Sequence, residues 1–351
     1  MKNIIGLILI LASSILTTNI AVASSAEPDF ADLYEEHSKS VVTVYTSTVT
    51  KRGAMPKKSR GLGSGVLIEE DQILTAAHVV DGADFIEVLF PDDVRIKADV
   101  VASLQASDIA LLKLRRPHPN PTVAVLADSD QTRIGSKVFI IGSPFGITQT
   151  LSIGHLSGRM DRGLLVDGTP IEFLQTDTAI NTGNSGGPMF NSKGEVIGIV
   201  SFILTKSGGF DGIGFATSSN TAREALLTSS GVLAGFEGIM LDERTASVLN
   251  FPGPGLLVQR VVSDSIIGEA GLEAGSIPAQ IGNQSLLLGG DLILEINGLI
   301  CATPHDFQLV RASTLALDGA NSYSITVFRD GEVIDLIAGT EPEGTIMTLS
   351  H

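Results

Sequence analysis

A serine enclosed by glycines has the setting of a catalytic nucleophile. The stretch 177–188 reads DTAINTGNSGGP, so Ser185 lies among Gly183, Gly186 and Gly187. Glycine adopts backbone angles closed to other residues and allows a substrate backbone to come close. A serine hydroxyl is nevertheless a poor nucleophile unless an imidazole accepts its proton and N–H donors stabilise the resulting oxyanion. The chain should therefore also contain a histidine and a carboxylate that orients it.

A histidine and an aspartate occur upstream in suitable settings. His78 follows the apolar run at 73–77, and Asp108 directly precedes the apolar run at 109–114. The chain order His78, Asp108, Ser185 is that of chymotrypsin, whereas subtilisin-like and α/β-hydrolase enzymes use other orders. Each motif alone also fits an ordinary turn, a structural histidine or a cap. All three together, in this order, predict a serine hydrolase triad.

The elements that would position these residues are predicted to be strands. Between Gly63 and Ala216, short runs rich in Val, Ile, Leu and Phe are separated by Gly, Pro, Asn and Asp. No long helical pattern interrupts them. Such spacing is typical of an all-β barrel or sandwich. A short helix over 219–227 is predicted to close this domain.

Several segments resemble the HtrA/DegP family of trypsin-like serine proteases. Besides the serine loop, they are GSGVLI at 63–68 and GIGFA at 212–216, and the resemblance covers about residues 30–345. Thr182 is a departure, since many members have proline or arginine there, but no chemistry is expected of its side chain. The resemblance implies a chymotrypsin-like double β-barrel over 41–230, with the histidine and the acid on the first barrel and the serine on the second.

The resemblance also implies a role for each residue. His78 is expected to be the general base toward the Ser185 hydroxyl and then the general acid toward the leaving amine. Asp108 is expected to hold the imidazole tautomer and stabilise its charged form. By their place in the motif, the backbone N–H groups of Gly183 and Ser185 are expected to form the oxyanion hole.

The primary specificity pocket is expected to be apolar. Trypsin-like enzymes that cut after Lys or Arg have an acid six residues before the serine, and this position is Ala179 here. Ile180 lies beside it, and the run Ile213, Gly214, Phe215, Ala216 is expected to offer the edge with which substrate pairs. A charged side chain left unpaired there would be costly to desolvate. Cleavage is therefore expected after small or medium apolar residues.

Residues 1–23 match a secretory signal peptide. Lys2 precedes an apolar run at 4–20, and the small residues Ala-Val-Ala follow at 21–23. The run is near the length needed to span a bilayer, so an uncleaved membrane anchor is the alternative. We favour cleavage after Ala23 because the site is well formed and polar residues weaken the second half of the run. Either outcome exports the protease, and we expect a periplasmic protein.

The composition argues against several classes of function. Lys plus Arg number 23 against 39 Asp plus Glu, and this net charge of −16 disfavours binding of nucleic acid through phosphates. Cys301 is the single cysteine, so neither an intrachain disulfide nor a cysteine-based zinc site can form; we expect it in the core or at an edge of the second domain. The six histidines show no His-Glu-x-x-His pattern. We therefore expect no catalytic metal and no cofactor.

The N-terminal segment 24–40 is a candidate for oligomerisation. Phe30, Leu33 and Tyr34 recur at helical intervals before the first predicted strand. Phe30 and Tyr34 have two interpretations of equal weight, as core contacts or as subunit contacts. The second follows from the resemblance, because this segment makes a trimer in the family. It implies a homotrimer or a higher oligomer.

Residues 231–351 resemble a single PDZ domain, a small β-barrel with helices. The resemblance rests on GLLVQRVV at 255–262, AGLEAG at 270–275 and GDLILEING at 290–298, whose final Asn-Gly is a hairpin signal. Such domains bind peptide C-termini by adding a strand to a free sheet edge. The domain is therefore expected to bind peptide C-termini or to regulate the protease.

The expected carboxylate-binding loop contains Phe236, Gly238 and Ile239. Glu237 departs from the usual apolar residue within it, and an acid near a peptide carboxylate would weaken binding. A second departure is the insertion 276–289, which carries Ile and Leu and could partly cover the groove.

These features predict a serine endopeptidase of the cell envelope that degrades unfolded or damaged proteins during stress. One alternative is a membrane-anchored regulatory protease that cuts a single signalling substrate when its PDZ domain senses exposed C-termini. The other is a chaperone-like protein that binds unfolded polypeptides and has only latent activity, because family members can hold the active-site loops in an inactive geometry.

Overall fold

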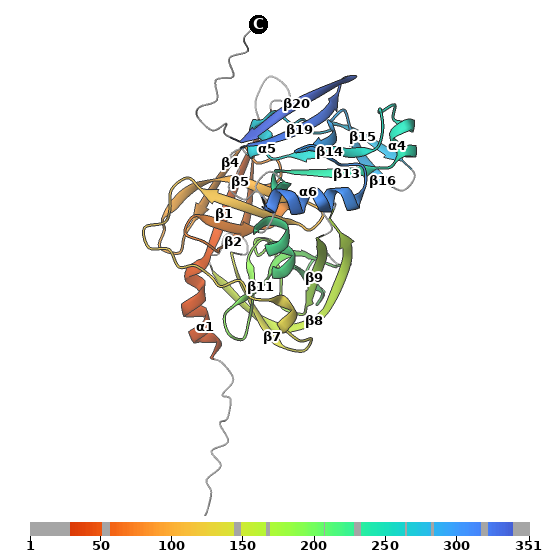
Figure 1. Cartoon of the computed structure of the whole chain (residues 1–351). Coiled ribbons are helices and arrows are strands. Elements are labelled where there is room, and N and C mark those ends of the chain that lie inside the picture. The colour runs from red at the N-terminus through yellow and green to blue at the C-terminus, as the bar shows by residue number, and fades with distance from the viewer. Residues whose placement is uncertain are drawn as a thin grey trace, which may run out of the picture.

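The computed structural model describes residues 29–50, 57–143, 149–165, 169–206, 208–227, 233–263, 265–281, 284–316 and 322–339. Two closed β-barrels are followed by a C-terminal sheet with helices, which lies against the β4–β5 side of the first barrel (Figure 1). The expected double barrel with one PDZ-like domain is confirmed. The predicted signal peptide, residues 1–23, lies outside the described residues.

An N-terminal helix, α1 (Phe30–His37), is attached to the second barrel. The Phe30 ring meets the Phe139 ring edge-on at 5.8 Å between centroids, and the Tyr34 hydroxyl donates to the Gln149 carbonyl at 2.7 Å. Phe30 and Tyr34 therefore make contacts within one chain, as the first of their two interpretations expects. A 3₁₀ turn, η1 (Ser38–Ser40), leads into the first strand.

The first barrel is antiparallel, with strand order β1-β2-β3-β6-β5-β4. Along β6, successive residues face alternately the interior of the first barrel and the second barrel. Ala110 and Leu112 fill the first barrel, whereas Ile109 and Leu111 pack in a shared core that includes Phe139. Its elements are β1 (Val41–Thr50), β2 (Lys57–Leu67), β3 (Gln72–Thr75), α2 (Ala77–Val80), β4 (Phe85–Leu89), β5 (Arg95–Leu104) and β6 (Ile109–Leu114).

The second barrel has the strand order β10-β11-β12-β9-β8-β7. The predicted closing helix forms at its end as one α-helical turn followed by one π-helical turn, and Ser218 caps it by accepting the Thr221 N–H at 3.2 Å. Its elements are η2 (Ser129–Gln131), β7 (Lys137–Gly142), β8 (Thr150–Leu164), β9 (Pro170–Thr176), β10 (Pro188–Asn191), β11 (Val196–Ile203), β12 (Gly214–Ser218), α3 (Ser219–Ala222) and η4 (Arg223–Leu227).

The C-terminal domain is built on the sheet β13-β14-β17-β19-β20, with β18 paired to β17. A separate hairpin, β15–β16, is formed by the insertion noted in the sequence. Elements of this domain are η5 (Leu233–Gly235), β13 (Phe236–Leu241), α4 (Glu243–Val248), β14 (Gly255–Val261), α5 (Ile266–Glu269), β15 (Ile277–Ile281), β16 (Gln284–Leu288), β17 (Leu292–Ile296), β18 (Leu299–Ile300), α6 (Pro304–Ala316), β19 (Ser322–Arg329) and β20 (Glu332–Gly339).

The two faces of this sheet bury different partners. Leu256 packs in a core with Phe307 of α6, while its neighbour Leu257 packs on the opposite face with Leu286 of the β15–β16 hairpin. Cys301 is fully buried in the α6-side core, where burial raises the pKa of its thiol to about 12. This location agrees with the expected core position and makes the thiol unreactive. Among the described residues, no helix has both the length and the apolar character needed to cross a bilayer.

Candidate active site

His78 and Asp108 lie in contact at the edge of the first barrel. His78 belongs to the short helix α2 directly after β3, and Asp108 ends the turn between β5 and β6 with a positive φ of 48°. The imidazole Nδ1 is 2.9 Å from both carboxylate oxygens, and the His78 backbone N–H donates to Oδ1 at 3.0 Å. An N–H on Nδ1 leaves Nε2 as the proton acceptor. The pair thus has the tautomer that a general base requires.

A residue of the second barrel completes the surroundings of this carboxylate. The hydroxyl of Ser201, on β11, donates to Asp108 Oδ2. Only 16% of the Asp108 side chain is exposed, so its charge is held by hydrogen bonds from both barrels. The sequence reasoning did not identify Ser201. The available signal was a polar residue within the apolar run of β11, sixteen residues after Ser185.

Ser185 lies at the same junction. Its carbonyl accepts the Ser64 N–H from β2 at 2.8 Å, which ties the serine loop to the first barrel. Its hydroxyl donates to the Ser201 carbonyl at 3.4 Å, a long bond, and none joins it to His78 among the described residues. In the absence of substrate, hydrogen bonds between catalytic groups are often long and tighten only in the reacting complex.

The loop before Ser185 has the geometry of a type II turn. The Asn184 N–H donates to the Asn181 carbonyl at 3.0 Å, and Gly183 has a φ of 106° at the third position, where a positive φ favours glycine. The Ser64 hydroxyl donates to the Gly183 carbonyl at 2.7 Å and fixes the peptide. Within the described part of the chain, the backbone N–H groups of Gly183 and Ser185 make no hydrogen bond. They are therefore available as a pair of oxyanion donors.

The predicted pocket residues occupy two different environments. Ala179 is exposed, whereas Ile180 is 3% exposed and packs inside the second barrel beside Gly214. Phe215 of β12 and the preceding Ile213 pack in a different cluster, which also contains Phe202. Phe202 was not among the predicted pocket residues. The structure therefore brings Ile180 and Gly214 together, with Ala179 next to Ile180 in the chain, whereas Ile213 and Phe215 lie in a different cluster.

The expected pairing edge is wrong. Strand β12 is paired on both sides, to β11 and to β9, so the run 213–216 has no edge left for substrate. The residues of β11 that follow Val200 pair only with β12 among the described strands. The free edge beside Ser185 is therefore Ser201–Ile203, which the sequence reasoning missed.

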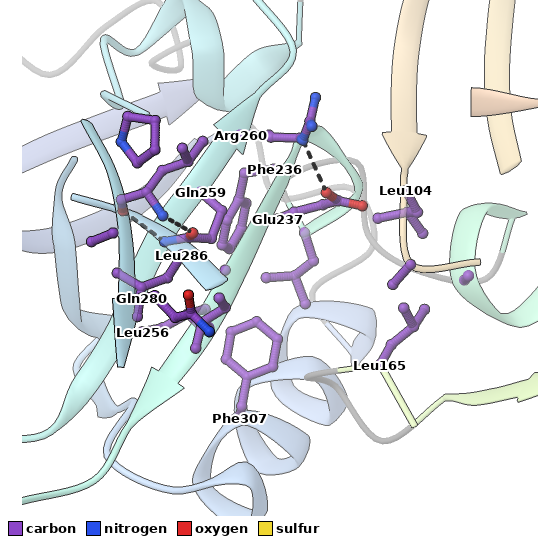
Figure 2. A pocket seen from close by; sticks show the side chains of 18 residues that line it. Leu104, Leu165, Phe236, Glu237, Leu256, Gln259, Arg260, Gln280, Leu286 and Phe307 are labelled. Carbon is purple, nitrogen blue, oxygen red and sulfur yellow. Dashed lines mark hydrogen bonds and ion pairs between the residues drawn. The ribbon is translucent and has the colours of Figure 1, made fainter. Parts of the chain in front are cut away.

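The residues expected to form a carboxylate-binding loop form a strand instead. Phe236, Glu237, Gly238 and Ile239 begin β13 because they pair with β14 from Phe236 onward. The outer edge of β13 is unpaired in the described sheet, which starts at this strand. A cavity of about 770 Å³ lies along it (Figure 2). The cavity walls come from β13, from α6, from the β15–β16 hairpin and from the edge of the protease barrels.

No group of three or more His, Cys, Asp or Glu side chains in the described residues is placed to hold a metal ion. The contacts described above are those that acyl transfer uses.

Comparison with known proteins gives the same picture. A family described as "trypsin-like peptidase domain" matches residues 63–199. A "probable periplasmic serine protease do/HhoA-like" of Haemophilus influenzae is 35% identical over 326 residues, covering 90% of this chain and 66% of the relative. A "probable periplasmic serine endoprotease DegP-like" of Ectopseudomonas mendocina is 32% identical over 353 residues, covering 89% of this chain and 74% of the relative.

Solved structures extend the similarity to the C-terminal domain. The "HtrA-type protease AlgW with decapeptide" is 28% identical and covers 89% of this chain and 98% of its own, with a TM-score of 0.50. The same protease with a tripeptide is 29% identical, and the match covers 90% of this chain and 99% of that protease, with a TM-score of 0.51. With identity above 30% across nearly three quarters of a curated relative, and with the double barrel in place, the chain belongs to the HtrA/DegP family of periplasmic serine endoproteases.

Proposed function

We propose that His78, Asp108 and Ser185 carry out peptide-bond hydrolysis in this protease. The observation that carries the assignment is the His78 Nδ1 to Asp108 contact at 2.9 Å, at the barrel junction where Ser185 is held by Ser64 and Ser201. This arrangement brings a base, its orienting carboxylate and a nucleophile to one place from segments 30 and 77 residues apart.

The reaction follows from the geometry. Nε2 of His78 takes the proton from the Ser185 hydroxyl as the oxygen attacks the substrate carbonyl. The N–H groups of Gly183 and Ser185 bind the oxyanion, and imidazolium then protonates the leaving amine. Asp108 stays ionised and stabilises the imidazolium. Water, activated by the same imidazole, hydrolyses the acyl-enzyme and restores Ser185.

The primary specificity is for small or medium apolar side chains. Substrate backbone pairs with the free edge Ser201–Ile203, which places the residue before the scissile bond beside Ala179, Ile180 and Gly214. The Ile180 side chain packs against the Cα of Gly214 and narrows this pocket. The position six residues before Ser185 is Ala179, so it carries no charge that could pair with a basic substrate side chain. A basic side chain there would lose its hydration without gaining a partner.

The substrates we propose are unfolded or damaged proteins of the cell envelope. The cavity along β13 takes a peptide C-terminus, which contacts Phe236, Gly238 and Ile239 together with Phe307 of α6. Structures of the related HtrA-type protease with a decapeptide and with a tripeptide support peptide binding as such. We further propose that the active form is a homotrimer or a larger oligomer.

One observation favours a regulated variant of this function. The Ser185 hydroxyl bonds to Ser201 and not to His78, as in a resting site that a peptide would activate. The two candidates are separated by assaying a peptide substrate with and without an added C-terminal peptide. Activation by the added peptide supports regulation, and equal rates support constitutive degradation. Binding without hydrolysis under both conditions would favour the chaperone-like alternative.

Hydrolysis of an unfolded model protein tests the proposal. Wild type is compared with Ser185→Ala and with Ser157→Ala, an exposed serine on β8 as the matched control. Cut sites mapped by mass should follow Val, Ala or Ile, and cleavage should vanish only in Ser185→Ala. Cleavage that persists in Ser185→Ala would refute the nucleophile, and cuts after Lys or Arg would refute the pocket.

A further inference from the structure

A carboxylate of the C-terminal domain is buried against the first protease barrel. Glu237 is the second residue of β13, and 17% of its side chain is exposed. It accepts the backbone N–H of Gln105, and the neighbouring N–H of Ala106 is near enough to lower the pKa of its carboxyl group. Figure 2 shows this side chain directed away from Phe307 and toward the end of β5 near Leu104. An acid in place of an apolar residue here is therefore explained by a contact between domains.

The two N–H groups belong to the turn that ends at Asp108. The Asp108 N–H donates to the Gln105 carbonyl at 3.2 Å, which closes the turn. Its third residue, Ser107, is fully buried, and its carbonyl accepts the Thr217 hydroxyl of the second barrel at 2.6 Å. The turn is thus fixed on one side by the second barrel and on the other by Glu237.

This turn is only partly buried, since Ser107 is fully buried, Gln105 is half-buried and Ala106 is exposed, and its N–H groups need an acceptor where the C-terminal domain covers them. The C-terminal domain covers the Gln105 side of the turn, and a covered N–H group without an acceptor is destabilising. The carboxyl oxygens of Glu237 can accept these N–H groups whether the group is ionised or protonated. Removing Glu237 therefore leaves the backbone directly before Asp108 without its partners, and the turn can relax.

The remaining charged neighbours contribute less. Arg260 lies 3.9 Å from Glu237, and it also pairs with Asp81 at the end of α2 at 2.8 Å. Arg260 and Asp81 are each about half exposed, and ion pairs at such positions contribute little to stability. Of these polar contacts, the buried one made by Glu237 is therefore the stronger.

We propose that Glu237 is a positioning residue for proteolysis: it holds the Gln105–Asp108 turn and so keeps the Asp108 carboxylate on His78. The inference rests on the proposed role of the His78–Asp108 pair. It makes full activity of the protease depend on docking of the C-terminal domain. A peptide in the adjacent cavity, which Glu237 and Ala106 both line, contacts the two sides of this connection at once.

The test compares full-length wild type with Glu237→Ala, Glu237→Gln and the control Glu332→Gln, an exposed acid on β20 of the same domain. The readouts are kcat and KM on a short peptide, and the low-field proton resonance of the His78 Nδ1–H. Glu237→Ala should lower kcat about 10- to 100-fold with KM changed less than about twofold, because a small displacement of a catalytic group has this effect. The resonance should weaken in parallel. Glu237→Gln keeps one acceptor oxygen and should recover most of the loss, and Glu332→Gln should match wild type.

An unchanged kcat and an unchanged resonance in Glu237→Ala would overturn the proposal and leave an adhesive contact between domains. If Glu237→Ala does not fold, Glu237→Leu, which keeps a side chain of similar size but has no acceptor, is compared with Glu332→Gln by the same two readouts; lowered kcat and a weakened resonance support the proposal, and wild-type values overturn it. Failure of the proposed function gives a different result, because wild type itself would then be inactive. The effect of Glu237→Ala on the His78 resonance would still show whether Glu237 positions Asp108.

Discussion

The hydroxyl of Ser201 in the second barrel donates a hydrogen bond to the same Asp108 carboxylate that holds His78 in the first barrel. The two barrels therefore share one charged group, and its orientation depends on their contact. The carbonyl of Ser201 also accepts the Ser185 hydroxyl. One residue thus joins the carboxylate and the nucleophile of the proposed triad.

Replacing Ser201 should impair catalysis more than stability. Ser201→Ala removes one donor from a largely buried carboxylate, which costs about 1–3 kcal/mol. We expect kcat to fall about 10- to 100-fold, since 1.4 kcal/mol corresponds to a factor of ten. Steady-state kinetics on a peptide measures this loss, with Ser157→Ala as the control. A kcat within twofold of wild type would show that the bond does not hold Asp108.

Gly186 should tolerate no side chain. It has a φ of 83°, and an added Cβ would overlap Thr75 Oγ1 and Ser64 O. Gly135 has a similar φ of 89° but open space around it, so it isolates the backbone strain alone. Gly135→Ala should cost about 1 kcal/mol and Gly186→Ala clearly more, with loss of activity. Denaturant melts measure both, and equal costs would contradict the close packing of the serine loop.

Enlarging the primary pocket should change specificity. Ile180→Ala removes the side chain beside Gly214, so cleavage after Leu and Phe should rise relative to cleavage after Val. Ile197→Ala in the same barrel core is the matched control, because each truncation costs about 2–5 kcal/mol of stability. Cut sites in an unfolded protein report the preference. A shift of equal size in both variants would mean that Ile180 does not shape the pocket.

Docking of the C-terminal domain should weaken as the pH rises. Burial raises the pKa of Glu237 from 4.5 to about 7. The N–H groups of Gln105 and Ala106 and the charge of Arg260 lower this pKa, but their effect is smaller than that of burial. The docked form therefore holds a proton that the undocked form releases. This contribution is complete below pH 4.5 and is lost as the pH rises to about 7. Scanning calorimetry from pH 5 to 8 should show a falling melting temperature for the docked domain. The decline should flatten in Glu237→Gln and persist in Glu332→Gln.

The double barrel could be predicted because its signals are local. Short apolar runs broken by glycine and proline indicate strands, and the order of His78, Asp108 and Ser185 selects one known arrangement. Contacts between distant segments carry no such signal. Ser201 reaches Asp108 across 93 residues, and Glu237 reaches Gln105 across 132, so neither partner could be found from spacing.

The pairing edge was wrong for a related reason. The run GIGFA at 212–216 has the apolar character of an edge that substrate pairs with, but the sequence does not show that β9 and β11 occupy both of its sides. The insertion 276–289 could be identified as extra, but its folding into the β15–β16 hairpin against Leu257 depends on the tertiary core.

The most direct test of the triad is covalent labelling of the full chain with a fluorophosphonate, followed by mass mapping of the adduct. Wild type is compared with His78→Ala and with His155→Ala, a half-exposed histidine that lies 3.4 Å from Asp177 and so controls for loss of a His–Asp pair. We predict one adduct, at Ser185, which forms about 10³-fold more slowly or worse in His78→Ala and at the wild-type rate in His155→Ala. An adduct at another residue, or equal labelling rates in wild type and His78→Ala, would contradict the account.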